Sequence, residues 1–238
     1  MRSFTRAGAA AMALLALGVS PSVAGALRVS PVGLDLPAGR AAATLTLRND
    51  DEAPMNVQVR VFRWTQGVEG ESLVPTDEVV VSPPIAPLAA RSERVVRVVR
   101  LGPESDRETS YRVVVDQLPP APGAQGQQVR LLMRHSVPLF FTPAGGAAPK
   151  LELTTERGPE GLRLLAVNRG ARRVRLANPR LLDHHGREVA AKTGLLGYVL
   201  AGSQTAWDLP LEATASAPVR FVADSDVGPI DVILAPRL

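Results

Sequence analysis

The chain contains no cysteine and only three histidines among its 238 residues. No disulfide can therefore support the fold, and thiol chemistry gives no information about the compartment. Aromatic residues make up 4% of the chain, whereas hydrophobic residues together make up 45%. A core must consequently be built mainly from valine, leucine and alanine. The 27 basic and 23 acidic residues leave a net charge of +4, which is too balanced to indicate a nucleic-acid partner.

The sequence patterns of common catalytic and cofactor sites are missing as well. There is no G-x-S-x-G, P-loop, dinucleotide fingerprint, H-E-x-x-H or C-x-x-C. His184 and His185 follow Asp183, but neighbouring residues of a strand point to opposite faces, so we interpret this segment as a polar turn. We therefore expect no enzyme activity, no cofactor and no metal site.

Two further polar features have a structural interpretation. Asp224, Asp226 and Gly228 resemble part of a calcium loop, but the terminal glutamate of such a loop is missing, so we expect these residues to cap a turn. His135 interrupts an apolar row and is expected to be packed or hydrogen-bonded rather than catalytic.

The first 26 residues have the pattern of an export signal. Arg2 and Arg6 precede an apolar run from Ala7 to Val19, which is too short to span a bilayer. Ala24-Gly25-Ala26 fits a cleavage site of small residues, and cleavage after Ala24 also fits. No second apolar run approaches membrane length. We therefore predict a mature protein that is exported, soluble and not embedded in a membrane.

The remaining sequence is typical of short strands joined by turns, with 21 prolines and 20 glycines spread along it. Valine density favours a strand over a helix at Glu93–Leu101, and Pro31 favours an edge or a switch between sheets. Turn signals at short spacing predict an immunoglobulin-like sandwich. Its expected strands are Leu27–Leu36, Ala43–Leu47, Asn56–Thr65, Val79–Ser82, Glu93–Leu101, Tyr111–Leu118 and Gln127–Pro143.

A second sandwich is predicted beyond a short, turn-rich linker. We place a first domain at 27–143, the linker at 144–149 and a second domain at 150–238. The expected fold class is all-β, with two immunoglobulin-like domains in a boomerang arrangement. The second set of expected strands is Lys150–Thr155, Gly161–Val167, Arg173–Leu182, Glu188–Ala191, Gln204–Leu209, Ala217–Val222 and Ile230–Leu234.

The stretch from Gln127 to Pro143 alternates over an unusual length for one strand. One face carries Val129, Leu131, Met133, His135, Val137, Leu139 and Phe141, and the other carries Arg130, Leu132, Arg134, Ser136, Pro138 and Phe140. Basic residues on the second face of the first half suit a sheet edge, whereas the second half is apolar on both faces and suits a core. We infer that the first half offers apolar side chains to another protein, while the second half anchors the strand in its own domain.

Five strings in order resemble the periplasmic pilus chaperones of the PapD-like superfamily, and in particular its archaic, or Csu-type, branch. They are VRVFRWTQ (59–66), SPP (82–84), RVVRV (94–98), YRVVVDQLP (111–119) and VPLFFTP (137–143). The resemblance covers almost all of the first domain and is weak in the second. It implies a boomerang of two immunoglobulin-like domains whose long strand is lent to pilus (fimbrial) subunits that lack a strand of their own.

Under this resemblance, Val129, Leu131 and Met133 form the donor strand that fills the subunit's groove, and an outer-membrane usher receives the subunit. A self-capping homodimer of the free chaperone is a further expected partner. In the better-known branch, an arginine and a lysine hold the terminal carboxylate of the subunit, but Gly33 and Pro138 stand at those positions here.

Four basic residues are candidate substitutes for the missing anchor, and each can instead be a solvated edge charge. They are Arg28, Arg112, Arg130 and Arg134. The better-known branch also builds a buried charge network between its domains, with a basic residue just before the proline of the long strand. Thr142 stands at that position here, so the network looks altered. Glu108 remains at the position of its acidic partner.

Two other functions are weighed against the chaperone. A structural or adhesive pilus component of two sandwiches needs a free, alternating N-terminal extension, and none is visible after the expected cleavage. An exported hydrolase needs a polar cluster that the sequence does not assemble.

Overall fold

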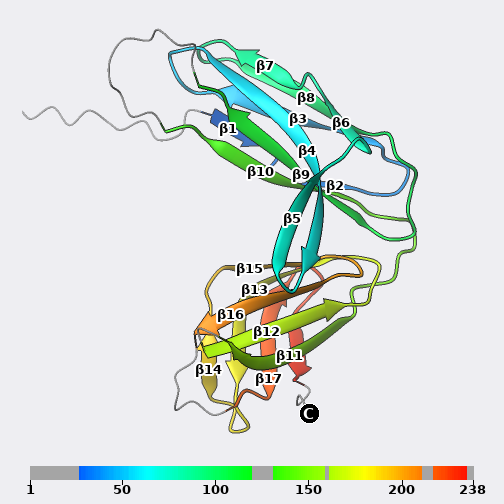
Figure 1. The fold of residues 1–238 in the computed structure, drawn as a ribbon, viewed down its shortest axis with the longest axis vertical. Helices are drawn as coiled ribbons and strands as arrows, with labels where there is room; N and C mark the ends of the chain where they lie inside the picture. The colour runs from blue at the N-terminus through cyan, green and yellow to red at the C-terminus, as the bar shows by residue number, and fades with distance from the viewer. Residues whose placement is uncertain (1–26, 120–130, 159–160, 211–216, 235–238) are drawn as a thin grey trace, which may run out of the picture.

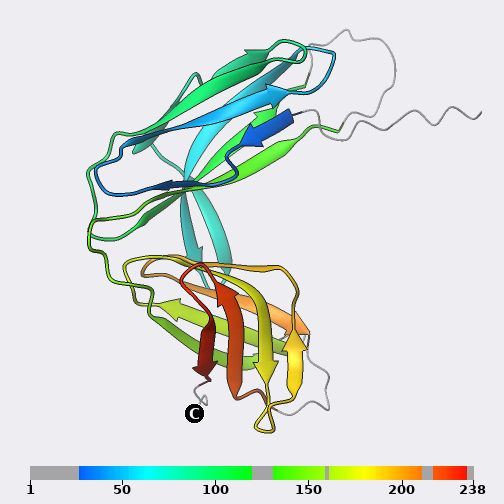
Figure 2. The same cartoon turned by 180° about the vertical axis from the view of Figure 1, so that it is seen from behind.

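The computed structural model describes residues 27–119, 131–158, 161–210 and 217–234, and the regular elements in these ranges are all β-strands. Two sandwiches stand at an angle and are joined along one side by the connection from β10 (Arg134–Phe141) to β11 (Leu151–Gly158) (Figures 1 and 2). The predicted all-β class of two immunoglobulin-like sandwiches is confirmed. The expected export signal at 1–26 lies outside the described residues.

The first sandwich consists of two sheets around one core. Its first sheet has the order β1 (Leu27–Ser30), β3 (Ala42–Asn49), β8 (Glu93–Arg100) and β6 (Val79–Ser82). Its second sheet has the order β2 (Leu34–Leu36), β10, β9 (Thr109–Gln117), β4 (Met55–Gly67) and β5 (Gly70–Pro75), and β7 (Ile85–Leu88) pairs with the start of β4.

Alternation along β4 explains how this sequence forms the core. Val57, Val59 and Val61 point inward, with 0%, 1% and 9% of their surfaces exposed, and Gln58 and Arg60 point out between them. Side chains of a strand alternate between the two faces of a sheet, so one apolar row faces the opposite sheet. The valine-rich rows that the sequence predicted therefore build the interior.

The first strand changes sheets at Pro31. β1 pairs with β3 in one sheet, whereas β2 runs parallel to β10 in the other. Proline lacks the N–H group that a continuous ladder needs, so the pairing is interrupted there. The predicted switch is confirmed, and it leaves β2 alongside only the last three residues of β10.

The second sandwich has the same architecture. One sheet has the order β11, β12 (Gly161–Asn168) and β16 (Gln204–Pro210). The other has the order β14 (Glu188–Ala191), β13 (Val174–Leu182), β17 (Arg220–Ser225) and β18 (Ile230–Ile233), and β15 (Leu195–Val199) also pairs with β13. Leucines, valines and Phe221 fill the space between these sheets.

Three strands were not predicted, because each lacks the expected pattern. All residues of β5 are exposed, so it shows no alternation. β7 contains Pro87, and β15 contains Gly197, whose φ of 154° is unfavourable for other residues. At Gly197 a Cβ atom would lie 3.0 Å from Nε1 of Trp207, so the glycine also makes room for that ring.

The predicted start of the long strand is wrong for the part that the structure describes. β10 begins at Arg134, and residues 131–133 are outside any strand. The partner strand β9 ends at Gln117, and two residues later Pro119 has no N–H group to continue the ladder. The last rung is made by the Gln117 N–H, which donates to the Met133 carbonyl at 2.9 Å.

The same buried asparagine arrangement stabilises both sandwiches. Asn49 and Asn168 are 0% and 1% exposed and lie at the ends of β3 and β12. Each side-chain oxygen accepts the N–H of the residue two positions on, and each amide nitrogen donates to the carbonyl four positions on. Each also donates to a distant carbonyl, that of Ala89 or Val199.

We predict that Asn168→Ala destabilises the second sandwich by about 2–4 kcal/mol, because buried backbone groups lose their partners. Urea unfolding followed by tryptophan fluorescence measures the change in the midpoint. Asn56→Ala is the control, since Asn56 is exposed and its side chain makes no hydrogen bond among the described residues. Equal midpoints for the two variants would contradict the role of Asn168.

Candidate functional site

The outer edge of β10 is the most unusual backbone feature of the first sandwich. β9 covers one edge along the whole strand, whereas β2 covers the other only from Leu139 to Phe141. Among the described residues, no strand pairs with the outer edge from Arg134 to Pro138. Unpaired N–H and C=O groups of an edge strand are a template for another strand. The first sandwich therefore presents a half-open edge.

The residues that lead into this edge are apolar and largely exposed. Leu131 is 88% exposed and Leu132 is 44% exposed, whereas Met133 is partly buried against the core of its own sandwich. Two of the residues predicted for this site, Val129 and Arg130, lie outside the described residues. Leu131 is thus available to a partner, and Met133 is shared with its own domain.

His135 lies at the same open edge. One of its ring nitrogens is 3.0 Å from the carbonyl oxygen of Leu27 in β1. The predicted hydrogen-bonded role of this histidine is confirmed, because its side chain links β10 to the first strand of the opposite sheet.

An ion-paired carboxylate holds the start of β10. Asp116 of β9 is 8% exposed and forms ion pairs with Arg134 of β10 and Arg60 of β4. Although burial opposes its ionisation, hydrogen bonds from both arginines lower the pKa of the Asp116 carboxyl. A cavity of about 460 Å³ opens beside this cluster and is lined by Gln58, Arg60, Asp116, Gln117, Leu118, Leu132, Met133 and Arg134.

A small aromatic cluster connects the two sandwiches. Trp64 and Phe140 of the first sandwich pack against Leu200 and Tyr198 of the second. The Trp64 ring lies 5.5 Å from that of Tyr198 and 5.9 Å from that of Phe140. Trp64 and Phe140 occupy the face of their sheet that looks away from its own core, so the junction buries what would otherwise be exposed aromatic surface.

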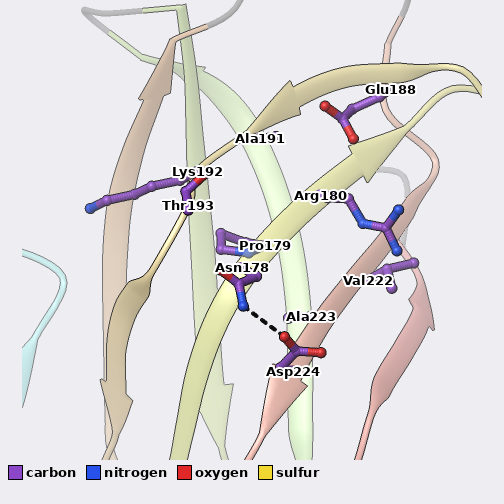
Figure 3. A pocket seen from close by; sticks show the side chains of 10 residues that line it. All are labelled: Asn178, Pro179, Arg180, Glu188, Ala191, Lys192, Thr193, Val222, Ala223 and Asp224. Carbon is purple, nitrogen blue, oxygen red and sulfur yellow. Dashed lines mark hydrogen bonds between the residues drawn. The ribbon is translucent and has the colours of Figure 1, made fainter.

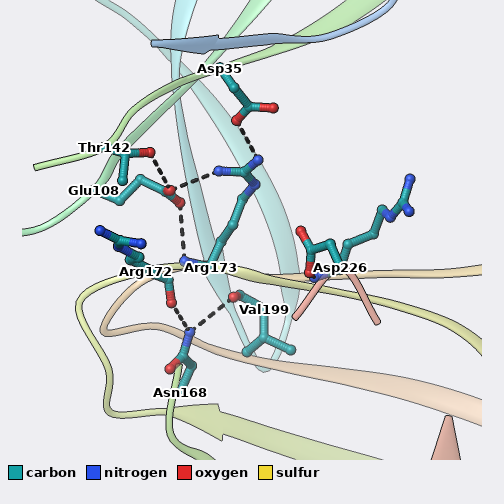
Figure 4. A network of polar contacts seen from close by, with 9 residues as sticks. Asp35, Glu108, Thr142, Asn168, Arg172, Arg173, Val199 and Asp226 are labelled. Carbon is teal, nitrogen blue, oxygen red and sulfur yellow. Dashed lines mark hydrogen bonds and ion pairs between the residues drawn. The ribbon is translucent and has the colours of Figure 1, made fainter. Parts of the chain in front are cut away.

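A polar network beside this cluster contains the buried carboxylate of Glu108 (Figure 4). Arg173 of the second sandwich donates to it from its guanidinium at 2.7 Å and from its backbone at 3.1 Å. Thr142 donates its hydroxyl at 3.0 Å, and Asp35 of β2 also pairs with Arg173. Arg173 was missed from the sequence because it comes from the other half of the chain.

Arg112 is the most buried of the predicted anchor residues that the structure describes. It pairs across the ladder with Pro138, and its guanidinium stacks 3.7 Å from the centre of the Trp64 ring. Only 17% of its side chain is exposed, and Glu71, at 3.9 Å, is its one ion-pair partner among the residues that the structure describes. Burial lowers the pKa of the Arg112 guanidinium, and the charge of Glu71 opposes that effect.

Gly33 and Pro138 come together, as expected for two positions of one site. A Cβ atom on Gly33 would lie 3.8 Å from Cγ of Pro138. Because Arg112 is the ladder partner of Pro138, a basic side chain is still present beside these two positions. Arg28 and Arg134 differ from it, since both are mostly exposed and make close ion pairs with Asp50 and Asp116.

The hairpin of β4 and β5 braces the second sandwich against the first (Figure 1). The side-chain amide of Gln66 accepts the Leu200 N–H at 2.9 Å and donates to the Tyr198 carbonyl at 2.8 Å. Arg163 of β12 donates to the Val68 carbonyl at the hairpin tip. This brace could not be predicted from the sequence, because the pattern of a surface hairpin does not reveal which surface it will meet.

The polar turn predicted at His184 and His185 has a structural role. Both histidines are exposed, whereas the Asp183 carboxylate is buried and accepts the N–H groups of His185 and Arg187. Although burial opposes its ionisation, these bonds and the Arg187 side chain lower the pKa of Asp183 to about 2. The described residues hold no group of three or more metal-ligating side chains.

The acidic loop near the end of the chain caps neighbouring backbone. Asp226 accepts the Arg175 N–H at 2.8 Å, and Asp224 accepts the side-chain amide of Asn178 at 2.7 Å. A cavity of about 370 Å³ lies here, where Asn178 has a φ of 48° (Figure 3). The side chains of Arg180 and Lys192 extend away from each other in Figure 3, so no charge converges on one point.

A membrane-spanning helix is not found in the described ranges of the chain.

We predict that Arg173→Met destabilises the protein by about 3–5 kcal/mol, because it leaves the Glu108 carboxylate buried without a counter-charge. Adding Glu108→Gln should recover part of the loss, since the amide needs no cation. Chemical denaturation of the three variants measures both effects. Arg169→Met, at an exposed pair with Glu152, should cost only about 0–1 kcal/mol. A double variant as unstable as Arg173→Met alone would contradict this account.

Comparison with known proteins places these features in a family. The family model described as the pili and flagellar-assembly chaperone, PapD N-terminal domain, matches residues 26–147. A probable fimbrial chaperone, EcpB of Klebsiella pneumoniae, is 30% identical over 107 residues, which are 44% of this chain and 47% of that protein. The chain thus spans about half the length of the curated relatives it matches.

Solved structures share the fold over most of the chain. The CsuC–CsuE chaperone–tip adhesion subunit complex of Acinetobacter baumannii contains a chain that aligns with a TM-score of 0.69 and 23% identity, covering 88% of this chain and 98% of that one. The Escherichia coli chaperone DraB aligns with a TM-score of 0.59 and 25% identity, covering 88% and 96%. The predicted resemblance to PapD-like chaperones is confirmed, and this protein belongs to the family of pili and flagellar-assembly chaperones, which are assembly factors rather than enzymes.

Proposed function

We propose that this protein is a periplasmic chaperone that binds pilus subunits by donor-strand complementation and delivers them to an outer-membrane usher. In this proposal residues 1–26 direct export, residues 27–143 form the subunit-binding domain, and residues 150–238 form the second domain. The half-open edge of β10 is the observation that carries the proposal, because it offers unpaired backbone to a chain that lacks a strand.

A partner sandwich that lacks a strand needs the backbone hydrogen bonds and apolar side chains that the open edge of β10 can supply. A sandwich that lacks one strand exposes both apolar core and unpaired backbone groups, and both promote aggregation. A strand added at the edge of β10 supplies hydrogen bonds through its backbone. Apolar side chains on alternate positions then fill the partner's groove, and Leu131 is already exposed for that purpose.

Each apolar side chain that enters the partner's groove should contribute appreciably to the free energy of binding. Burying a side chain such as Leu131 contributes about 1.5–3 kcal/mol as an upper bound. Several such contacts, together with backbone pairing, must outweigh the loss of freedom on association. The ordered part of β10 reduces that loss, because the ladder from Arg134 onward is in place before the partner arrives.

We assign the anchor for the subunit's terminal carboxylate to Arg112. Its guanidinium is largely buried, stacks on the Trp64 ring and makes no hydrogen bond among the described residues. Arg28 and Arg134 already bind carboxylates at close range. A guanidinium binds a carboxylate through two parallel hydrogen bonds, so Arg112 has the free donors that this role requires.

The donor segment is tested by Leu131→Asp. Because Leu131 is 88% exposed, we expect the variant to fold normally yet to recover at least tenfold less pilus subunit when the tagged protein is purified from the periplasm. Ile233→Asp is the matched control, since Ile233 is 80% exposed on the second sandwich. Normal subunit recovery with Leu131→Asp would refute the donor-strand role.

The anchor is tested by neutralising each basic residue in turn. Arg112→Met keeps an apolar contact with Trp64 but removes the charge, and we expect subunit recovery to fall by about tenfold or more. Arg28→Met and Arg134→Met should lower it by less than threefold, and Arg130→Met tests the fourth position. If Arg112→Met retains full recovery while another variant loses it, the anchor is assigned to the wrong residue.

A further inference from the structure

The partner of Arg112 within the chain is placed unusually far from it. Glu71 lies 3.9 Å away, whereas most other ion pairs of the first sandwich are much closer, as for Arg63 and Glu78 at 2.6 Å. At 3.9 Å the charges attract, but no hydrogen bond forms. The charge of Arg112 is therefore balanced, while its donors form no hydrogen bond with any described residue.

The hairpin determines where Glu71 stands. Glu71 is the ladder partner of Gln66, and the Gln66 amide donates to its carboxylate at 3.2 Å. Gln66 itself is held by two backbone groups of the second sandwich, the Tyr198 carbonyl and the Leu200 N–H. The Glu71 carboxylate is consequently held near Arg112 by the brace between the two sandwiches.

An incoming carboxylate meets both residues at once. It gains two hydrogen bonds from Arg112, but it is repelled by Glu71 as long as that carboxylate stays nearby. Glu71 is 47% exposed, so it can turn toward water without burying its charge. Binding at Arg112 therefore exchanges one carboxylate for another.

We propose that Glu71 is a displaceable internal counter-ion that sets how tightly Arg112 holds the terminal carboxylate of a pilus subunit. This inference rests on the proposed function and on the assignment of the anchor to Arg112. Glu71 acts through Arg112 and is a positioning residue.

The exchange of carboxylates at Arg112 matters when the subunit is released. A largely buried guanidinium that loses its ligand has an uncompensated charge unless another anion is at hand. Glu71 provides that anion within the chain, so the bound state is weaker and the empty state is more stable than without it. A carrier that must give up its subunit benefits from both effects.

The test compares Glu71→Gln with Glu69→Gln. Both remove one negative charge from the same hairpin, but Glu69 is exposed and has no ion-pair partner among the described residues. The probe is the major pilus subunit recovered in the co-purification, and the measurement is the lifetime of its complex during exchange with excess untagged chaperone. We expect Glu71→Gln to lengthen the lifetime by about two- to fivefold, and Glu69→Gln to leave it unchanged.

A second form of the subunit tests whether the effect of Glu71→Gln depends on the terminal carboxylate. Adding a short Gly-Ser tail moves the terminal carboxylate away from Arg112, and the advantage of Glu71→Gln should then disappear. Glu71→Asp, which keeps the charge, should have a lifetime closer to that of the unsubstituted protein. High salt should reduce the difference between the Gln variant and the parent.

The outcomes separate the two proposals. A stable complex whose lifetime is the same in Glu71→Gln, or an effect that persists with the tailed subunit, overturns this inference and leaves the chaperone function standing. Failure of the unsubstituted protein to bring down any subunit overturns both.

Discussion

A strand edge that stays open without aggregating is the constraint on which this structure depends. Pro31 diverts the first strand from one sheet to the other, so β2 protects only the end of β10. The remaining edge is bordered by His135, which bonds to Leu27, and by the ion pair of Arg134 with Asp116. Charges at an exposed edge discourage pairing with identical chains, because like charges then meet.

The junction between the sandwiches combines aromatic rings with guanidinium groups. Arg112 lies over Trp64, and Arg173 lies 3.5 Å from the centre of the Phe140 ring. Such contacts stabilise a cation that burial has deprived of water. Arg173 binds the carboxylates of Asp35 and Glu108 and so connects the two halves, whereas Arg112 makes no hydrogen bond to a described residue. Two arginines in similar surroundings thus serve different purposes.

Much of the fold follows from the sequence, and the exceptions have physical causes. Alternating valines placed β4 correctly, because a strand with one buried face needs that period, and valine density placed β8. The exposed hairpin strand β5 escaped detection, since solvent on both faces imposes no period. The strand that begins at Arg134 was predicted to begin too early, because alternation shows which face is apolar and not whether a ladder partner is present.

The candidate site was only partly predictable for a related reason. Arg112 was identified as one of four basic residues, but its burial depends on Trp64 and on a second sandwich that no local pattern specifies. Arg173 and Glu71 meet their partners across long sequence separations.

The two buried asparagines close equivalent corners of the two sandwiches. No internal repeat is visible when the two halves are compared letter by letter, yet Asn49 and Asn168 close the same corner with the same three kinds of bond. Two dissimilar sequences thus close a sandwich corner in the same way, because a buried reversal of the chain leaves the same set of backbone groups in need of partners.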